Sequence, residues 1–298
     1  MNPKPYKPKS YDLETKNGVL ALGSSTCIMG ILNVTPDSFS DGGRFFSLDD
    51  ALARARQLIA DGADILDIGG ESSRPFSEPV SEAEELRRVI PVIGHLAENL
   101  DVPISIDTTK ASVAKQALAA GAAMINDISA LRFDPDMAGV AADTGAPVVL
   151  MHMLGSPKDM QVDPAYDDLM GEIRGFLERV VLDAEKAGIS RAKIIIDPGI
   201  GFGKTVGHNL ELIRRLDRFS DLDLPILAGP SRKAFIRKLL AGKNQIQNEA
   251  DTSHDMVEFG TVAAVCASIL NGAHIVRVHD VGRARAAATI ADAVKNAL

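Results

Sequence analysis

The fold of this chain is indicated by a short pattern that occurs three times: Gly62-Ala-Asp-Ile-Leu-Asp67, Gly121-Ala-Ala-Met-Ile-Asn126 and Gly272-Ala-His-Ile-Val-Arg277. In each copy a glycine and an alanine precede a short apolar run, and a polar residue stands five positions after the glycine. Glycine often ends a helix because it adopts the left-handed conformation without strain. Each copy therefore predicts a helix end that leads into a strand. Capping explains the glycines, but it does not explain why the fifth position is polar.

Short apolar runs rich in Ile, Val or Leu recur along the whole chain. There are eight of them: Cys27–Leu32, Ile65–Ile68, Ile104–Ile106, Met124–Asp127, Val148–Leu150, Ile194–Ile196, Ile226–Ala228 and Ile275–Val278. Each is too short for a helix and is typical of a strand that is buried on both faces.

The longer segments between these runs have helical periodicity. Ser81-Glu82-Ala83-Glu84 is a capping box, and the apolar residues Leu86, Val89, Ile90 and Ile93 follow it at helical spacing. Ser47 similarly precedes a helix with the apolar face Ala51, Leu52, Ala55, Leu58 and Ile59. Strands that alternate with helices eight times predict an α/β fold, a (β/α)8 TIM barrel, with a doubly wound sheet as the alternative.

A hairpin is predicted before the first strand of the barrel. Asp12–Leu22 alternates in polarity around Asn17-Gly18, which favours a type I′ turn. We expect this hairpin to cover the bottom of the barrel. No linker or low-complexity segment follows Ser25, so we expect residues 1–25 to form a tail and hairpin, and residues 26–298 to form one barrel domain.

Composition excludes several classes of function. Acidic residues outnumber basic ones, 40 to 32, which argues against nucleic acid or an anionic membrane as a partner. Cys27 and Cys266 are far apart and outside any Cys/His cluster, so neither a disulfide framework nor a structural zinc site is expected. The first ten residues lack the apolar core of a secretory signal, and Thr261–Leu270 is about half a membrane span. We expect a cytoplasmic protein.

Polar residues gather where the predicted strands end, which in (β/α)8 barrels is the face that carries the chemistry. All eight ends are polar, and they include the carboxylates Asp41, Asp107 and Asp197 and the cations Arg74, Lys233 and Arg277. One polar residue at such a place often only caps the next helix. Several charges at one mouth are costly unless they are paired or bind a ligand. The sequence therefore predicts a site for a polar, partly anionic small molecule.

Two other kinds of site are disfavoured. Gly199–Thr205 resembles a phosphate-binding loop, but Pro198 stands where the Walker A motif requires its first glycine. The six histidines form no HExxH or HxH motif, so a zinc hydrolase is not supported. The glycines of this loop are better explained by a close approach of the backbone to a flat ligand.

The motifs at the strand ends resemble those of the dihydropteroate synthase family. They are Asn33–Gly43, Glu71–Pro75, Ile106–Thr108, Asn126-Asp127, Asp197–Lys204, Gly229–Lys233 and Arg277–Asp280. The resemblance runs from about Cys27 to the C-terminus. It implies a barrel, commonly a homodimer, that condenses 6-hydroxymethyl-7,8-dihydropterin pyrophosphate with p-aminobenzoate, with Mg²⁺ as cofactor. It also implies inhibition by sulfonamides, which mimic p-aminobenzoate.

The resemblance further implies which residues bind the pterin: Asp107, Asn126, Met151, Asp197, Phe202 and Lys233. The Asp197 carboxylate would accept hydrogen bonds from the 2-amino group and the adjacent ring N–H, a bidentate arrangement that suits a carboxylate. Asp107 and Asn126 would complete the polar edge, and Lys233 would reach the ring carbonyl and N5. Met151 and Phe202 would be apolar walls.

The remaining implied residues bind pyrophosphate, p-aminobenzoate and the metal. Asn33, Arg277 and His279 would hold the pyrophosphate, and Asn33 would also bind Mg²⁺. The residues implied for p-aminobenzoate and for a mobile lid over Ser38–Gly43 are Phe39, Ser73, Arg74, Pro75, Ser231 and Arg232. The family mechanism is dissociative, so Asp41 in the lid would lie near a cationic pterin, and Arg74 would pair with it. The implied catalytic residues are Asp41, Lys233, Arg277 and His279.

Two places depart from the family pattern. Ser73 stands where the family more often has Thr, which leaves sulfonamide sensitivity open. The polar segment Lys243–Glu258 is expected to be an extended surface loop before a helix that starts near Thr261, and Met256–Gly260 lacks an Arg that many members carry.

Two alternative functions remain open from the sequence. A methyltetrahydrofolate–corrinoid methyltransferase would share the barrel and the Asp and Asn contacts to the pterin, but Arg277, His279 and Ser231–Lys233 favour the synthase. A non-catalytic pterin-binding protein would not need Asp41 or the Arg277 and His279 pair.

Overall fold

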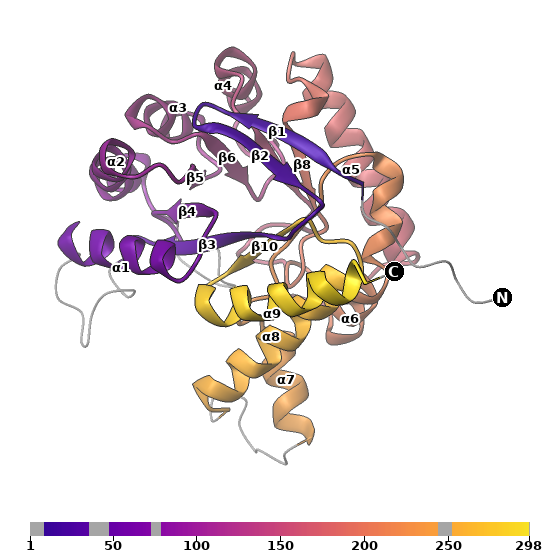
Figure 1. Ribbon diagram of the computed structural model, residues 1–298. Helices are drawn as coiled ribbons and strands as arrows, with labels where there is room; N and C mark the ends of the chain where they lie inside the picture. The colour runs from indigo at the N-terminus through magenta and orange to yellow at the C-terminus, as the bar shows by residue number, and fades with distance from the viewer. Residues whose placement is uncertain (1–8, 36–47, 73–78, 244–251, 298) are drawn as a thin grey trace.

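The computed structural model describes residues 9–35, 48–72, 79–243 and 252–297 (Figure 1). Its central feature is a barrel of parallel strands in the order β8-β7-β6-β5-β4-β3-β10-β9. The strands are β3 (Cys27–Asn33), β4 (Ile65–Gly69), β5 (Ile104–Asp107), β6 (Met124–Asp127), β7 (Val148–Met151), β8 (Ile194–Asp197), β9 (Leu227–Ala228) and β10 (Ile275–Val278). A parallel bridge between Ile196 and Ile226 joins β8 to the segment before β9 and closes the barrel. The predicted (β/α)8 barrel is confirmed.

Helices alternate with these strands and surround the barrel (Figure 1). In the described part of the chain they are α1 (Leu48–Ala60), α2 (Glu82–Asn99), α3 (Ala111–Ala120), α4 (Met137–Thr144), α5 (Leu169–Lys186), α6 (Val206–Arg214), α7 (Ala234–Lys243), α8 (His254–Leu270) and α9 (Val281–Lys295), with short 3-10 helices at Arg191–Lys193 and Leu216–Leu222. Ser81 caps α2 as predicted, because its side chain accepts from the Glu84 N–H at 3.3 Å. Gly62, Gly121 and Gly272 all have positive φ, which fits their predicted place between a helix and a strand.

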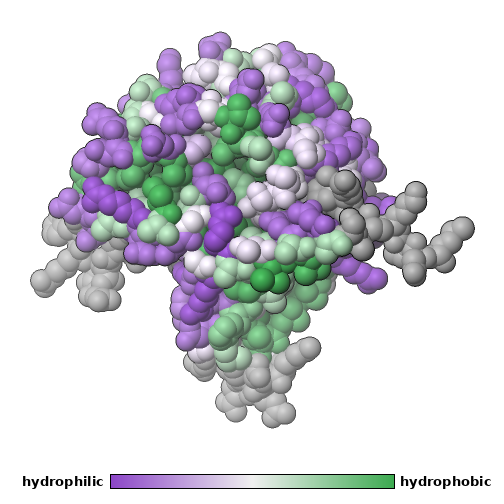
Figure 2. All heavy atoms as spheres, viewed as in Figure 1, coloured by the Kyte–Doolittle hydropathy of each residue, from purple (hydrophilic) through white to green (hydrophobic). Residues whose placement is uncertain are grey.

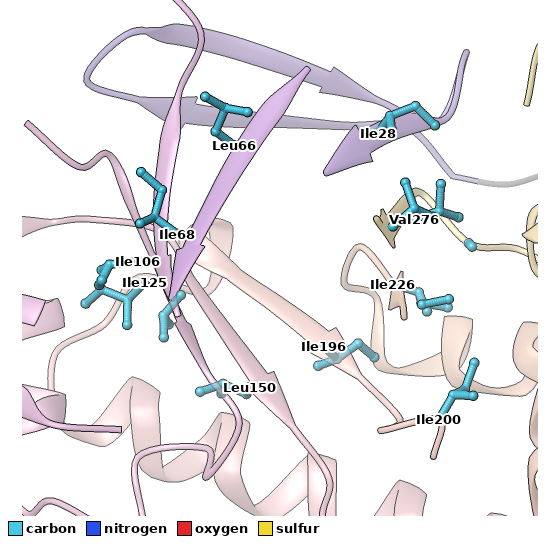
Figure 3. Close-up of a cluster of buried hydrophobic side chains, with 14 of the residues drawn as sticks. Ile28, Leu66, Ile68, Ile106, Ile125, Leu150, Ile196, Ile200, Ile226 and Val276 are labelled. Carbon is cyan, nitrogen blue, oxygen red and sulfur yellow. The ribbon is translucent and has the colours of Figure 1, made fainter. Parts of the chain in front are cut away.

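Alternate residues of each strand face the surrounding helices. Figure 3 shows this outer core, in which the strands contribute Ile28, Leu66, Ile68, Ile106, Ile125, Leu150, Ile196 and Val276, all fully buried. Because side chains alternate along a strand, the residues between them face the interior of the barrel.

The interior is filled in layers, each supplied by alternate strands, as in other TIM barrels. The lowest layer comes from β4, β6, β8 and β10 and consists of Ile65, Met124, Ile195 and Ile275. The next comes from β3, β5, β7 and β9 and consists of Met29, Ser105, Val149 and Leu227, and the strand register places each beside a residue of the lowest layer. The bottom half of the barrel is therefore a closed and mainly apolar core.

The N-terminal hairpin closes this core from below. It consists of β1 (Tyr11–Thr15) and β2 (Gly18–Leu22), which pair antiparallel and lie across the barrel in Figure 1. Leu13 and Leu22 point into the barrel and pack in the same cluster as the lowest interior layer. The hairpin thus covers the bottom of the barrel, as expected.

The turn of the hairpin differs from the predicted type I′ turn. That type needs positive φ at both central residues, but the central residues here are Lys16 and Asn17, and the positive φ of +123° belongs to Gly18, which already pairs with Thr15. The Thr15 hydroxyl accepts a hydrogen bond from the Asn17 backbone N–H at 3.1 Å, which supports this turn. The prediction placed the glycine one residue too early in the turn.

The start of α8 also differs from the expectation. The helix begins at His254, with Ser253 as its N-cap accepting from the Met256 N–H at 3.3 Å. The expected surface loop over Lys243–Glu258 is therefore wrong from residue 254 onward, and residues 244–251 lie outside the described part. The polar composition was misleading because Glu258, although charged, belongs to the buried face of this helix.

We expect Leu13→Ala to lower the free energy of unfolding by about 2–5 kcal/mol, the usual cost of a buried leucine-to-alanine change. The side chain is 1% exposed and fills space between the hairpin and the barrel. Denaturant unfolding measures the loss. Val19→Ala is the matched control, because Val19 lies on the same hairpin but is 60% exposed. Equal stability of the two variants would show that the hairpin does not complete the core.

Candidate active site

Above the two apolar layers the barrel interior becomes polar. The next layer again comes from β4, β6, β8 and β10, two residues further along each strand, and consists of Asp67, Asn126, Asp197 and Arg277. Three of these are the polar fifth positions of the repeated sequence pattern. They meet because each is the third residue of an alternate barrel strand, and such residues share one interior layer. The barrel geometry therefore explains the feature that capping left unexplained.

Asp67 and Arg277 are the most closely connected members of this layer. Arg277 Nε donates to Asp67 Oδ2 at 2.6 Å, and Asn126 Nδ2 donates to the same oxygen at 3.0 Å. The far end of the guanidinium, Nη2, donates to Asp107 Oδ2 at 2.6 Å. Burial opposes the charge of Arg277, but Asp67 and Asp107 together outweigh it and raise the pKa of the guanidinium above its usual value. One cation therefore links two carboxylates across the mouth.

The two carboxylates proposed to face a ligand are both desolvated. Burial raises the pKa of Asp107, and the charge of Asp67 adds to the effect, while Arg277 opposes it. Burial also raises the pKa of Asp197 to about 6, against the hydrogen bond from the Gly199 N–H and the charges of the nearby lysines. Asp197 Oδ1 accepts that N–H at 2.7 Å.

Two lysines lie close to Asp197. The Lys233 ammonium lies 3.6 Å from the centre of the Phe202 ring, within cation–π range. Burial lowers the pKa of Lys233 to about 7, and the charge of Arg277 lowers it further, against Asp197 and Asp107. Burial likewise lowers the pKa of Lys204 to about 7, against the attraction of Asp197.

Lys204 is held by neutral partners. Its ammonium donates to the Phe202 carbonyl at 2.8 Å and lies 3.0 Å from His152 Nδ1. Burial, followed by the charge of Lys204, lowers the pKa of His152 to about 2, so the imidazole is neutral and can accept at Nδ1.

The glycine-rich loop after β8 lies directly on the end of β7. Gly199 has φ +72°, and a Cβ there would lie 1.8 Å from the His152 carbonyl oxygen. Asn209 Oδ1 accepts from the Gly201 N–H at 2.6 Å, and the Tyr166 hydroxyl donates to the Gly203 carbonyl at 2.8 Å. These contacts fix the position of Phe202 between the glycines.

An apolar wall borders the polar layer on this side. Met151 and Phe202 belong to one buried cluster that also contains Ile128, Met153 and Met160. A polar interior next to a sulfur-rich and aromatic wall suits a flat ring with hydrogen-bonding groups along one edge.

The other predicted residues of the described chain lie at the rim. Asn33 is the last residue of β3. The Ser231 hydroxyl accepts a hydrogen bond from the backbone N–H of His279 at 3.2 Å, and it lies 2.9 Å from Nδ1 of the His279 ring. Arg232, with φ +57°, forms an ion pair with the buried Glu258 and donates its backbone N–H to Thr261 at 3.1 Å. Its side chain lies toward α8, and its role toward p-aminobenzoate stays a prediction.

The structure thus brings together most of the predicted pterin and pyrophosphate residues. Those in the interior and its wall are Asp107, Asn126, Met151, Asp197, Phe202, Lys233 and Arg277, and those at the rim are Asn33, Ser231 and His279. The predicted residues Phe39, Asp41, Ser73, Arg74 and Pro75, and the proposed lid, lie outside the described residues. Sequence reasoning assigned no role to Asp67, Lys204 or His152. The polar fifth position was the available signal for Asp67, and the loop motif was the signal for Lys204.

Two kinds of feature are absent from the described residues. Within the ranges given above, no group of three or more His, Cys, Asp or Glu side chains is arranged to hold a metal ion. No helix in that part of the chain is both long and apolar enough to cross a membrane.

Comparison with known proteins gives a consistent result. Residues 29–279 match the family described as "Pterin binding enzyme". The dihydropteroate synthase of Synechocystis sp. is 49% identical over 272 residues, which covers 91% of each chain. The solved structure of Yersinia pestis dihydropteroate synthase with a sulfonamide drug complex has a TM-score of 0.88 at 44% identity, covering 96% of this chain and 100% of that one. Xanthomonas albilineans dihydropteroate synthase with 4-aminobenzoic acid has a TM-score of 0.87 at 43% identity, covering 97% and 99%.

Proposed function

This chain belongs to the pterin-binding enzyme family, among the dihydropteroate synthases, and from that premise we propose how its residues divide the work. The enzyme condenses 6-hydroxymethyl-7,8-dihydropterin pyrophosphate with p-aminobenzoate to give 7,8-dihydropteroate and pyrophosphate. The observation that carries the division of roles is the polar layer of Asp67, Asn126, Asp197 and Arg277 beside the wall of Met151 and Phe202.

The pterin ring is bound inside the mouth of the barrel. The 2-amino group and the adjacent ring N–H are two donors side by side, and the Asp197 carboxylate can accept both. Asn126 and Asp107 contact the remaining polar edge, and Lys233 donates to the ring carbonyl and N5. Phe202, held under the Lys233 ammonium, stacks against the ring face. Each of these groups is preorganised in a largely water-excluded site, where hydrogen bonds to charged groups are strongest.

The pyrophosphate is held by Arg277 from the interior and by His279 and Asn33 at the rim. Magnesium usually takes one or two protein oxygens together with phosphate oxygens and water, and the Asn33 amide oxygen at the end of β3 is an oxygen donor of that kind. Mg²⁺ bound there would neutralise charge on the leaving pyrophosphate. The Arg277 guanidinium supplies a permanent positive charge on the same side.

The reaction is dissociative in our proposal. The bond between the exocyclic methylene and the pyrophosphate oxygen breaks first, and its electron pair leaves with the pyrophosphate. The resulting cation is delocalised over the pterin, and the Asp107 and Asp197 carboxylates are close enough to the ring to stabilise it. The amine lone pair of p-aminobenzoate then forms the new C–N bond, and one amine proton is released.

We also propose a homodimer, sulfonamide inhibition and a cytoplasmic setting. Figure 2 shows hydrophobic residues gathered over α8 and α9, where Phe259 is 67% and Ile290 66% exposed. A contiguous exposed apolar surface favours contact with a second copy.

Relatives have been solved with a sulfonamide and with 4-aminobenzoic acid, which supports the same inhibitors and substrate here. Both cysteines are free thiols, which favours a reducing compartment.

The test of the function is a turnover assay with purified protein, Mg²⁺ and dihydropterin pyrophosphate, with and without p-aminobenzoate. We expect dihydropteroate to form, together with pyrophosphate, when p-aminobenzoate is present, and no dihydropteroate to form without it. Sedimentation of the same sample reports the dimer. Tight pterin binding without any product would contradict the synthase assignment and favour a binding protein.

A further inference from the structure

Asp67 is a charged residue for which the proposed reaction has no direct use. It is fully buried in the third interior layer, directly beside Ser105 in the strand register. Its Oδ2 accepts from both Arg277 and Asn126, whereas its Oδ1 has no hydrogen-bond partner among the described residues. A buried carboxylate with one unused oxygen is costly, and an apolar residue at such a place is often as stable or more so. Stability alone therefore does not account for Asp67.

The two carboxylates bound to Arg277 differ in what a substrate would do to them. Asp107 accepts a hydrogen bond from Nη2 of the guanidinium, but it is also a proposed ligand of the pterin. A pterin that binds therefore competes with Arg277 for the oxygens of Asp107. Asp67 accepts a hydrogen bond from the guanidinium at Nε, is fully buried, and is not among the proposed ligands of the pterin. Nε is the nitrogen nearest the aliphatic stem, and because the guanidinium is planar and rigid, a bond there fixes its orientation and leaves both terminal nitrogens available to other acceptors.

We propose that Asp67 is a positioning residue that holds Arg277 by Nε while the pterin occupies Asp107, so that the terminal nitrogens of Arg277 are presented to the pyrophosphate. The same oxygen orients the Asn126 amide toward the pterin edge. Asp67 thereby couples the two halves of the substrate through one buried carboxylate oxygen. This inference rests on the pterin and pyrophosphate roles proposed above.

Asp67→Asn is the direct test, because it keeps the volume but replaces the carboxylate that pairs with the Arg277 charge by a neutral amide. We expect the affinity for inorganic pyrophosphate with Mg²⁺, measured by calorimetry, to fall at least tenfold, in the range expected for a lost hydrogen bond between charged groups. Affinity for 6-hydroxymethylpterin, which carries no phosphate, should fall less. Ser105→Ala is the matched control: it removes a buried hydroxyl that has no partner in the adjacent interior position and should leave both affinities unchanged.

A double-mutant cycle separates positioning from a general structural role. If Asp67 acts through Arg277, adding Asp67→Asn to Arg277→Met changes pyrophosphate affinity less than twofold. Additive losses would overturn the inference. If Arg277→Met binds pyrophosphate as tightly as the unmodified protein, the proposed pyrophosphate role of Arg277 fails. If Arg277→Met loses affinity but Asp67→Asn does not, only the positioning role of Asp67 fails.

A measurement on the unmodified protein covers the case in which Asp67→Asn does not fold. The Nε–H of Arg277, assigned by its loss in Arg277→Lys, should exchange slowly with water in NMR spectra of the free protein. It should stay protected after pterin and pyrophosphate are added, while the terminal N–H signals shift. Loss of Nε–H protection on binding would show that Asp67 releases Arg277 and would overturn the proposal.

Discussion

Asp197→Asn is expected to lower kcat/KM for the pterin substrate by a thousandfold or more. In the proposed binding mode the ring presents two adjacent donors to this position, and an amide would turn its own NH₂ group toward one of them. Sites built to hydrogen-bond a substrate discriminate by about 10⁴–10⁵ when the pairing is lost, because buried polar groups are left unpaired. Steady-state kinetics and calorimetry with 6-hydroxymethylpterin measure the loss. The exposed carboxylate Asp183, which pairs with Lys186 on α5, provides the control variant Asp183→Asn.

The same reasoning predicts a pH dependence in the unmodified protein. Asp197 has its pKa raised to about 6, so below that pH the folded protein increasingly carries the neutral acid, which cannot accept both ring donors. Affinity for 6-hydroxymethylpterin should therefore fall at least about tenfold per pH unit below the pKa of Asp197, because Asp107, whose pKa is also raised by burial, adds to the loss. A probe without phosphate is needed because pyrophosphate titrates in the same range. Affinity that is flat from pH 7 to pH 5, or near-normal turnover of Asp197→Asn, would exclude Asp197 as the pterin acceptor.

Lys233→Met is expected to lower kcat by about two orders of magnitude, the range typical of removing one preorganised donor, and to stabilise the fold at the same time. Burial lowers the pKa of Lys233 to about 7 from an ordinary value of 10.5, so the folded state disfavours the ammonium. Below pH 7 the lysine is charged in both states and the full penalty applies. As the pH rises toward 10.5, only the unfolded state remains charged, so the penalty declines and stability rises.

The stabilisation by Lys233→Met should therefore be largest near pH 6, on the order of 1–3 kcal/mol, and should vanish above the ordinary lysine pKa. Scanning calorimetry at pH 6 and at pH 10.5 measures the difference. Lys238→Met, an exposed lysine on α7, is the matched control and should change neither property. Destabilisation at pH 6 would show that neighbouring charges compensate for the burial of the Lys233 ammonium, which would contradict the expected gain in stability.

Much of the fold follows from local features of the sequence. The eight apolar runs agree with the strands to within one or two residues, because short apolar runs between helical segments are typical of buried parallel strands. Ser81 and the recurring Gly-Ala pairs act through bonds and φ values that span only a few residues, so local sequence predicts them well. The motifs at the strand ends also identified the family, and they contain most of the residues that the structure brings together at the mouth of the barrel.

The tertiary structure decided what depends on residues far apart in the chain. The hairpin turn and the start of α8 were predicted wrongly, because the first depends on pairing register and the second on Glu258 being buried against Arg232. The sequence alone showed that Asp67, Asn126 and Arg277 occupy equivalent places in three repeats. Only the closure of the barrel puts alternate strands in one layer and makes those three side chains partners. Local sequence specifies where each strand begins and ends, whereas the register around the closed barrel determines which inward side chains meet.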